Sequence, residues 1–286
     1  MTVDDLPTVT YGIDDLDYHA EITRRLLDVF DQYLIPAIGF VNERKLYWEN
    51  ALDTARVRLL EEWLQRGYEL GNHTYAHTNY HQVPLRVYAE DIQKGERVTR
   101  PLMERYGYEL RYFRHPYLRI GLTKAHHDSL RQFLQQQQYQ EAPVTIDNDD
   151  YLFAKAYHHA FVRQDSSLMR QIGHDYVAYM EEKVHYFERA SEQLEGRNVK
   201  HILLLHANKL NADYLGALAA MYQKNQYRFI SLAEALTDEA YQQEITEYDD
   251  WGISWIDRWA LSRGRTDFLR EDPPTPEHIV KLAELE

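Results

Sequence analysis

Cysteine is absent from this chain of 286 residues. Its absence excludes disulfide scaffolds, thiolate-bound zinc, iron–sulfur clusters and cysteine nucleophiles. Any metal site must therefore use histidine, aspartate and glutamate, and the chain has 14 histidines to supply. The absence does not decide the compartment, because a secreted chain of this length can bury a sufficient core without disulfides.

Long hydrophobic runs and an excess of positive charge are also missing. No apolar run approaches the roughly 18 residues of a membrane-spanning helix, so we expect no membrane span. The 46 acidic residues exceed the 32 lysines and arginines, which gives a formal net charge of −14. Such a chain would not neutralise phosphates, so we expect no nucleic acid or anionic membrane among its partners. The sequence does not indicate an oligomeric state.

The first residues lack the basic and apolar segments of a signal peptide. Thr2 and Val3 are typical of the end of a core strand that has lost its first residues, and Asp4 and Asp5 follow directly. We interpret this start as the result of a processed or deleted leader.

Apolar runs and amphipathic segments alternate through most of the chain, which predicts a parallel sheet covered by helices. We expect a distorted, incomplete (β/α) barrel with about seven parallel strands. The predicted strands are 2–3, 35–41, 68–70, 112–113, 144–146, 202–205 and 227–230. The predicted helices are 22–33, 52–66, 85–106 with a break near Pro101, 123–138, 215–224 and 232–236.

The domain organisation follows from where this alternation stops. We expect residues 1–240 to form the barrel, with a helical insertion at about 152–196. Residues 241–286 lack the alternation and carry three tryptophans at helical spacing between 251 and 259. Such spacing is more typical of one buried helix face than of a carbohydrate platform. We therefore expect a C-terminal helical extension packed on the barrel.

Reactive side chains follow five of the predicted strands. In an α/β barrel, active-site residues come from the carboxyl ends of strands, which meet at one face. The residues at these ends are Asp4 and Asp5, His73 and His77, Arg114, Asp147 to Asp150, and His206. This pattern predicts one site built from all five ends.

His73 and His77 are spaced so that both imidazoles reach one ion if they share a helical turn. The pair alone is weak evidence, because histidines in polar loops are mostly solvated. A carboxylate from another strand end would complete a set of two histidines and one aspartate. That set leaves coordination positions open for water and substrate.

Asp4 and Asp5 have two interpretations. Paired acids before a proline, here Pro7, often cap a helix or close a turn. If both carboxylates are buried, their repulsion requires a cation or a proton, so one would bind metal and the other act as a base. Asp14 and Asp15 are a rival pair, whose simpler role is to cap the next helix.

The chain resembles the polysaccharide deacetylases, carbohydrate esterase family 4 with the NodB homology domain, in five motifs. The motifs are Thr2-Val3-Asp4-Asp5-Leu6-Pro7, His73-Thr74-Tyr75-Ala76-His77, Arg114-His115-Pro116-Tyr117, Asp147-Asn148-Asp149-Asp150-Tyr151 and Leu204-Leu205-His206. They occur in the family's order, and the resemblance spans Thr2 to about Leu236. It implies a hydrolase that removes acetyl groups from an N- or O-acetylated carbohydrate.

The resemblance also implies roles for the acidic and histidine residues. Asp5, His73 and His77 would bind a divalent metal, with zinc expected first and cobalt, nickel or manganese as alternatives. Asp4 would be the catalytic base. His206 would be the general acid.

Five further residues receive roles from the same resemblance. Arg114 would orient the base, and Asp150 would keep the acid charged. The backbone N–H of Tyr117 would help to form the oxyanion hole. Leu204 would line the acetyl pocket, and Tyr151 stands where the family commonly has the tryptophan of that pocket's wall.

The first motif departs from the family pattern, because Leu6 replaces its usual glycine. The Asp14 pair would give a more typical spacing to the next strand. We prefer the Asp4 pair, because Pro7 fits the motif and a strand precedes it.

Two other functions remain open on the same fold. One is hydrolysis of non-sugar C–N bonds of the cyclic imide or ureide type, and the other is carbohydrate binding without catalysis. A metal-dependent phosphatase is disfavoured by the net charge and by the lack of a phosphate-binding glycine loop. The resemblance implies a secreted or periplasmic protein, with a cytoplasmic location as the alternative.

Overall fold

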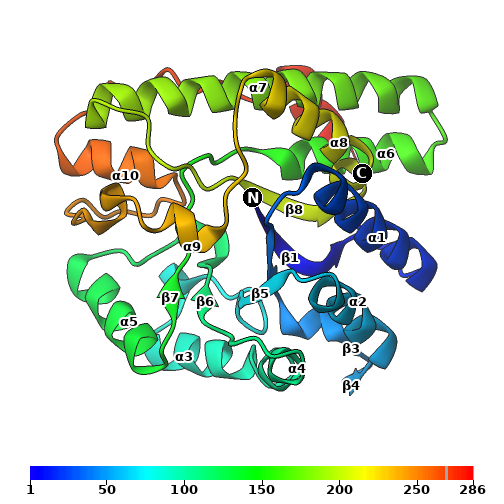
Figure 1. Cartoon of the computed structure of the whole chain (residues 1–286), viewed down its shortest axis with the longest axis horizontal. Coiled ribbons are helices and arrows are strands. Elements are labelled where there is room, and N and C mark those ends of the chain that lie inside the picture. The colour runs from blue at the N-terminus through cyan, green and yellow to red at the C-terminus, as the bar shows by residue number, and fades with distance from the viewer. Residues whose placement is uncertain (268–269, 286) are drawn as a thin grey trace.

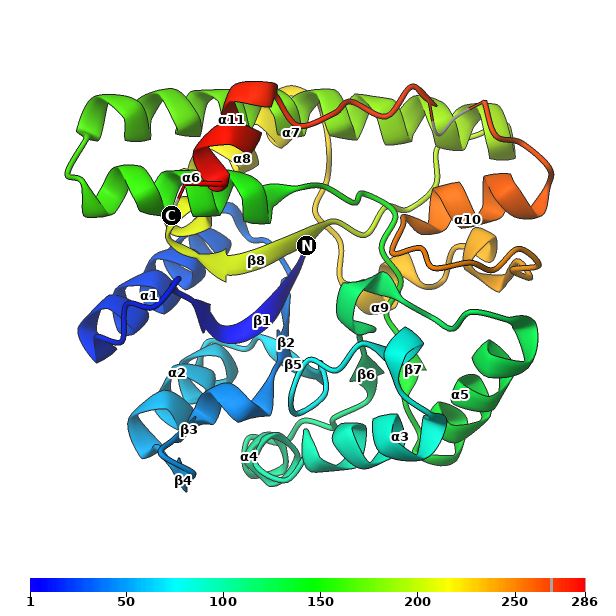
Figure 2. The ribbon, with the colours of Figure 1, turned by 180° about the vertical axis from the view of Figure 1, so that it is seen from behind.

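A single parallel sheet organises the fold in the computed structural model, which describes residues 1–267 and 270–285. Its strand order is β7-β6-β5-β2-β1-β8. Figures 1 and 2 show the curved sheet with helices around its outside. The strands of the sheet are β1 (Thr2–Val9), β2 (Ile38–Val41), β5 (Glu69–Asn72), β6 (Tyr112–Phe113), β7 (Gln140–Glu141) and β8 (Leu204–Asn208).

The helices follow the strands in the alternation that the sequence predicts. The first six are α1 (Leu16–Tyr33), α2 (Thr54–Gln65), α3 (Leu85–Lys94), α4 (Thr99–Arg105), α5 (Lys124–Gln136) and α6 (Asp150–Val162). The others are α7 (Ser166–Glu195), α8 (Lys209–Lys224), α9 (Leu232–Ala235), α10 (Trp255–Ser262) and α11 (Glu277–Ala283). A short antiparallel pair, β3 (Tyr47–Trp48) and β4 (Ala51–Leu52), stands apart from the sheet. The predicted distorted, incomplete (β/α) barrel is confirmed.

The barrel is open between β7 and β8, where two strand predictions are wrong. Residues 144–146 contribute only a single parallel bridge, from Ile146 to Leu203. Residues 227–230 form no strand; the Tyr227 N–H bonds to the Tyr222 carbonyl at the end of α8, and the segment stays largely half-buried. A strand needs a neighbour for its backbone ladder, and a branched or aromatic run does not supply one.

The inside of the barrel is filled by apolar side chains that α9 covers. Leu232 and Ala235 of α9 pack with buried residues of the strands and the segments beside them. These are Ile38, Phe40, Tyr112, Ala142 and Ile202. The barrel interior is therefore a packed core, and polar side chains gather at the end toward which the strands run.

The first strand is longer than predicted, because β1 runs Thr2–Val9 and contains Asp4 and Asp5. Its register against β2 shifts between Val3 and Leu6, and Asp5 has a left-handed backbone with φ +67°. A bulge of this kind re-aims side chains without ending the strand. The sequence does not reveal it, because an aspartate pair before proline is equally typical of a strand end.

The predicted helix 85–106 is divided at Gly95 into α3 and α4, rather than bent at Pro101. A Cβ at Gly95 would lie 2.5 Å from the carbonyl carbon of Thr74, so this glycine permits close packing against the His73–His77 loop. Pro101 lies in the first turn of α4, where its missing N–H costs no hydrogen bond.

The insertion and the extension pack together on one side of the barrel. Helices α6 and α7 occupy the predicted insertion and pack against each other, and α11 packs against α6. Trp255 and Trp259 are buried on α10, whereas Trp251 precedes that helix. Residues 268, 269 and 286 of the predicted extension lie outside the described residues. Within the described ranges, no helix is both long and apolar enough to cross a membrane.

Candidate metal centre and active site

The three predicted metal ligands lie together. Asp5 Oδ1 is 3.8 Å from His73 Nε2 and 3.7 Å from His77 Nε2. One potential ligand atom from each residue lies within 4.8 Å of the other two. Two imidazole nitrogens and one carboxylate oxygen are a donor set that suits zinc and neighbouring divalent metals.

The bulge in β1 brings both carboxylates to the same place. Adjacent residues of a regular strand point to opposite faces of a sheet. Here Asp4 Oδ2 and Asp5 Oδ1 each lie 3.8 Å from His73 Nε2. Lys45 Nζ donates to the carbonyl oxygens of Asp5 at 2.9 Å and Thr8 at 3.3 Å, which ties the bulged segment to the chain after β2.

The two histidines lie on a loop, not on the helical turn that their spacing suggests. Thr74 and His77 have left-handed backbones, with φ +65° and +54°. Asn72 Oδ1 accepts from the Thr74 N–H at 2.7 Å, and this side-chain turn replaces the first helical bond. The loop still directs both imidazoles toward Asp5.

Hydrogen bonding prepares His73 for metal binding. Its Nδ1 lies 2.9 Å from the Arg114 carbonyl, so Nδ1 carries the proton and the Nε2 lone pair faces Asp5. Burial lowers the pKa of His73 well below its usual value, which keeps the ring neutral. Burial likewise lowers the pKa of His77.

Asp5 fits the role of the anionic ligand. Burial opposes its ionisation, but the charges of Lys45, His77 and His73 outweigh burial and lower its pKa. Its Oδ1 is buried and has no hydrogen-bond partner among the described residues. A bound cation would satisfy this oxygen, so the residues present fit a divalent metal.

Asp4 is a buried carboxylate held by an arginine. It is 2% exposed, and its Oδ2 lies 3.4 Å from Arg114 Nη1. Arg114 is fully buried and also donates to the Ala142 carbonyl at 2.7 Å and to Thr2 Oγ1 at 2.9 Å. Burial raises the pKa of Asp4 to about 6, although Arg114 favours the ionised form. A carboxylate in this state can both accept and release a proton near neutral pH.

His206 forms a short hydrogen bond with Asp150. His206 Nδ1 lies 2.6 Å from Asp150 Oδ1. The backbone N–H of His206 donates to Asp150 Oδ2 at 2.9 Å. Burial disfavours the charged ring, but Asp150 outweighs burial and raises the pKa of His206 to about 9. The imidazole is therefore positively charged at neutral pH.

Sequence reasoning missed the residues that hold this pair. Asn211 Nδ2 donates to Asp150 Oδ2 at 2.7 Å and to the His206 carbonyl at 2.8 Å. Tyr176 donates its hydroxyl proton to Asn211 Oδ1 at 2.6 Å. The one feature that could have indicated such residues is that a fully buried carboxylate needs several hydrogen-bond donors around it. Sequence reasoning also missed Lys45, because the spacing of the motifs does not indicate that this side chain contacts Asp5.

The remaining predicted residues occupy different surroundings. Tyr117 is 54% exposed, and its ring centroid lies 4.4 Å from that of His77. Leu204 is buried in β8, two residues before His206 and therefore on the same face of the strand. Tyr151 is 50% exposed near the start of α6, where its carbonyl accepts from the Tyr11 hydroxyl.

The rival acidic pair lies at the start of α1 and is not part of the donor set of Asp5, His73 and His77. Asp14 pairs with Arg56, and Asp15 caps the helix by accepting from the backbone N–H groups of Asp17 and Tyr18. This geometry favours the Asp4 pair for the first motif.

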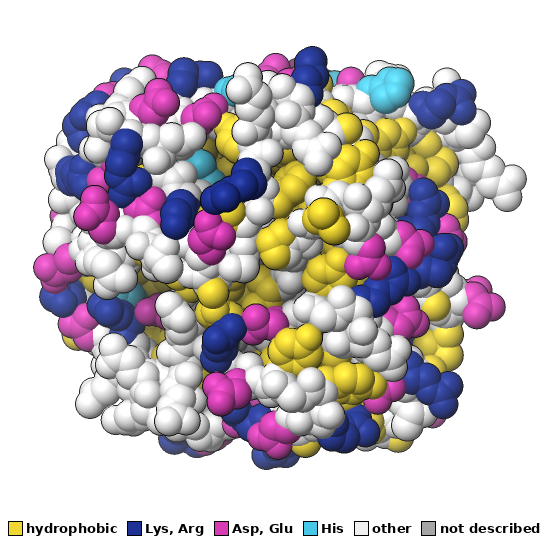
Figure 3. All heavy atoms as spheres, in the orientation of Figure 1, with side chains coloured by type: hydrophobic (Ala, Val, Ile, Leu, Met, Phe, Trp, Pro, Cys, Tyr) yellow, Lys and Arg dark blue, Asp and Glu magenta, His cyan; other side chains and the backbone are white. Residues whose placement is uncertain are grey.

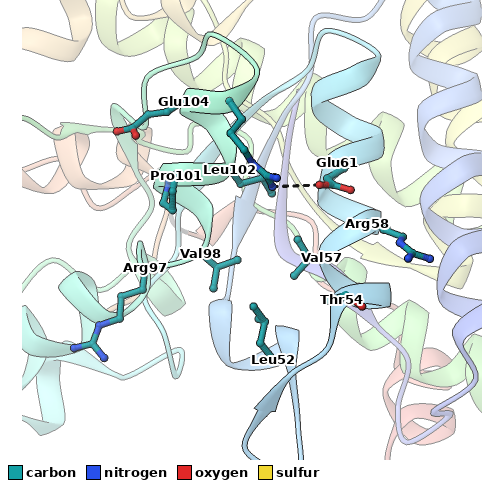
Figure 4. Close-up of a pocket in the computed structure, with 11 residues that line it drawn as sticks. Leu52, Thr54, Val57, Arg58, Glu61, Arg97, Val98, Pro101, Leu102 and Glu104 are labelled. Atoms are coloured by element: carbon teal, nitrogen blue, oxygen red, sulfur yellow. Dashed lines mark hydrogen bonds and ion pairs between the residues drawn. The ribbon is translucent and has the colours of Figure 1, made fainter.

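A separate hollow of about 860 Å³ lies between α2 and α4. Figure 4 shows the side chains around it. Arg105 of α4 pairs with Glu61 of α2 at 3.3 Å. Its apolar lining comes from Leu52, Val57, Val98, Pro101 and Leu102. None of the five motifs contributes to this lining, so we do not assign the chemistry there.

Residues 1–142 match the sequence model of a family described as polysaccharide deacetylase. No curated protein matches the chain. Its structure is similar to that of the chitin deacetylase from the fungal pathogen Colletotrichum lindemuthianum. That comparison has a TM-score of 0.54 and 19% identity, and it covers 82% of this chain and 84% of the other.

Two further solved structures are similar. The Bc1960 peptidoglycan N-acetylglucosamine deacetylase aligns at TM-score 0.51 and 17% identity, over 87% of this chain and 88% of that one. A mutant, with restored activity, of a family 4 pseudoenzyme from Bacillus anthracis aligns at TM-score 0.51 and 16% identity. That alignment covers 82% of this chain but 65% of the pseudoenzyme's length. At these identities the similarity establishes the fold.

Proposed function

We propose that this chain removes acetyl groups from an N- or O-acetylated carbohydrate in a metal-dependent reaction. The chain belongs to the polysaccharide deacetylase family, whose sequence model matches residues 1–142. The observation that carries the proposal is one site with three kinds of group. It combines the donor set of Asp5, His73 and His77, a buried carboxylate at Asp4 and a charged imidazole at His206.

Asp5, His73 and His77 would hold the metal in this proposal, with zinc as the first candidate. When bound, the ion would supply positive charge that acidifies water and polarises a carbonyl group. Asp4 takes a proton from the water that attacks the acetyl carbon. Its distance of 3.8 Å from His73 Nε2 supports this role, since the base then stands beside the metal ligands.

His206 completes the reaction as the general acid. As the bond from the acetyl carbon to the sugar nitrogen or oxygen breaks, His206 gives its proton to the leaving atom. Asp150 keeps the imidazole charged until that step, which the short hydrogen bond between them supports. One carboxylate and one imidazole thus divide the two proton transfers.

Backbone and apolar groups complete the proposed site. The Tyr117 N–H donates a hydrogen bond to the oxyanion that develops on the acetyl oxygen. Leu204 and Tyr151 bound the pocket for the acetyl methyl group. Arg114 keeps Asp4 ionised and oriented, as their ion pair suggests. We further propose that the protein acts outside the cytoplasm, where acetylated polymers are accessible.

Acetate release from a substrate panel tests the proposal. The panel contains chitin oligomers, peptidoglycan, acetylated xylan and bacterial exopolysaccharide, together with a cyclic imide and a ureide. We expect acetate from at least one glycan, loss of activity with a chelator and recovery when zinc is restored. Ring opening without acetate release would favour a non-sugar amidohydrolase. Glycan binding without acetate release by the zinc-loaded protein would indicate a non-catalytic relative.

A further inference from the structure

The loop that carries Tyr117 has an unfavourable backbone. Tyr117 and Leu118 have φ values of +58° and +54°, so two consecutive residues with side chains are left-handed. Such residues persist only when surrounding contacts hold them. Within the loop, the Leu118 N–H bonds to the His115 carbonyl and the Arg119 N–H to that of Pro116.

The C-terminal extension supplies further contacts to this loop. Gly252 lies directly against the Tyr117 carbonyl, and a Cβ at this position would be 2.0 Å from that oxygen. Arg258 of α10 is 1% exposed and donates to the carbonyls of Leu118 at 2.8 Å and Trp251 at 3.1 Å. Both peptide groups after the Tyr117 amide are therefore packed or bonded against the extension.

Asp250 of the extension makes a second set of contacts, at the end of the Tyr117 loop. Asp250 pairs with Arg119 at 3.2 Å and accepts from His81 Nδ1 at 2.9 Å. His81 Nε2 then accepts from the Gly121 N–H at 3.0 Å. The extension thus holds the segment 117–121 at both ends.

The same segment of the extension is fixed to the other side of the barrel opening. Ser254 Oγ donates to the Thr145 carbonyl at 2.9 Å, and the Trp255 N–H donates to the Val144 carbonyl at 2.7 Å. Val144 and Thr145 directly precede the fourth motif, which begins at Asp147. Residues 250–258 therefore connect the third and fourth motifs across the opening between β7 and β8.

We infer that residues 250–258 are a positioning element that orients the Tyr117 amide for oxyanion stabilisation. The inference deepens the proposed function and rests on it. Gly252 and Arg258 act through Tyr117 and do not themselves touch the substrate. The metal ligands come from β1 and the loop after β5, so a change at Gly252 or Arg258 displaces the amide while the donor set stays in place.

Two substitutions test this positioning. Gly252→Ala introduces the clash with the Tyr117 carbonyl, and Arg258→Met removes both hydrogen bonds while retaining an apolar stem. Loss of one oxyanion-hole donor typically lowers kcat by about 10²- to 10³-fold. Because an amide is displaced rather than removed, we expect kcat to fall between about tenfold and a thousandfold. The KM should change by less than about threefold, and the zinc stoichiometry should stay as in the wild type.

Arg263→Met is the matched control. Arg263, just after α10, donates to the Leu194 carbonyl and pairs with Glu195, so it anchors the extension to α7 instead of to the loop. We expect this variant to lower Tm and to retain the wild-type kcat. A purely structural role for residues 250–258 would give all three variants this same behaviour.

The outcomes separate the inference from the proposed function. A zinc-loaded wild type without acetate release overturns both. An active wild type with unchanged kcat in Gly252→Ala and Arg258→Met overturns the inference alone. If those variants do not fold, Arg258→Lys decides, because lysine reaches one of the two carbonyls. A several-fold lower kcat at unchanged KM supports the inference, and a wild-type kcat contradicts it.

Discussion

The chemistry at residue scale depends on two acids whose surroundings separate their roles. Asp4 and Asp5 are neighbours, yet burial raises the pKa of Asp4 to about 6, whereas Lys45, His77 and His73 lower that of Asp5. A ligand that stays ionised and a base that titrates near neutral pH are what the proposed reaction requires.

The His206 pair leads to a prediction about pH. A general acid must be protonated, so kcat/KM should fall as pH rises through about 9, the raised pKa of His206. Asp150→Asn removes the charge that raises this pKa, and the alkaline limb should move toward the ordinary value of about 6.5. At pH 8 the protonated fraction then falls roughly thirtyfold. A pH–rate profile of the variant measures the shift, and an alkaline limb that stays near 9 would assign it to another group.

The sequence predicted which reactive residues meet but not what holds them. The ends of parallel strands converge, so His73, His77 and the Asp4 pair could be placed together before the structure. Lys45 and Asn211 could not, because each acts through contacts between elements far apart in the chain. The left-handed Asp5 was equally hidden, since short polar segments adopt several turn geometries.

At element scale, the loop with the two histidines is shaped by the helices beneath it. Gly95, between α3 and α4, packs against the Thr74 backbone, and the Tyr75 N–H donates to the Asp91 carbonyl of α3. The metal site therefore depends on a break between two helices as well as on strands.

Gly95→Ala tests this dependence. The added Cβ would lie 2.5 Å from the Thr74 backbone and must displace the His73–His77 loop. We expect zinc affinity to weaken by about tenfold or more, equivalent to about 1.4 kcal/mol. Gly216→Ala on α8 is the control, because its Cβ would meet nothing closer than 3.9 Å and zinc affinity should stay unchanged. Equal zinc affinities in both variants, measured by chelator competition, would show that the loop does not depend on this packing.

Element boundaries were predictable where burial and periodicity agree, as in α2, α5 and the end of α1, whereas α1 starts at Leu16, six residues before the predicted start. The predicted strand at 227–230 failed because β-propensity describes a side chain's fit to a sheet and not the presence of a neighbouring strand. The helix break at Gly95 escaped prediction because its cause is a contact with a loop about twenty residues earlier.

At the scale of the whole molecule, the net charge of −14 does not mark the site. Figure 3 shows acidic and basic side chains interspersed around hydrophobic ones on the face viewed in Figure 1. Three of the acidic residues, Asp4, Asp5 and Asp150, belong to the proposed site. The C-terminal extension contacts both sides of the barrel opening, at Leu118 and at Thr145, so it contributes to the structure around the site.

Metal binding should stabilise the entire fold. Zinc at one hundred times its Kd adds about 2.7 kcal/mol to the free energy of unfolding. For a chain of this size that corresponds to a rise in Tm of roughly 4–5 °C. Asp5→Asn should remove most of this rise, whereas Asp14→Asn should retain it, because Asp14 pairs with Arg56 and is not part of the donor set of Asp5, His73 and His77. Calorimetry with and without zinc measures the difference, and a zinc-dependent rise that survives in Asp5→Asn would place the ion elsewhere.

The central claim is that Asp4 is the base of a metal-dependent deacetylation, and one rate comparison tests it most directly. Acetate release is measured with zinc-loaded wild type, Asp4→Asn and Asp14→Asn at equal zinc content on the best glycan of the panel. We predict a loss of about 10²-fold or more in Asp4→Asn, the usual contribution of a general base, and a nearly wild-type rate in Asp14→Asn. Full activity in Asp4→Asn together with a loss in Asp14→Asn would contradict the account.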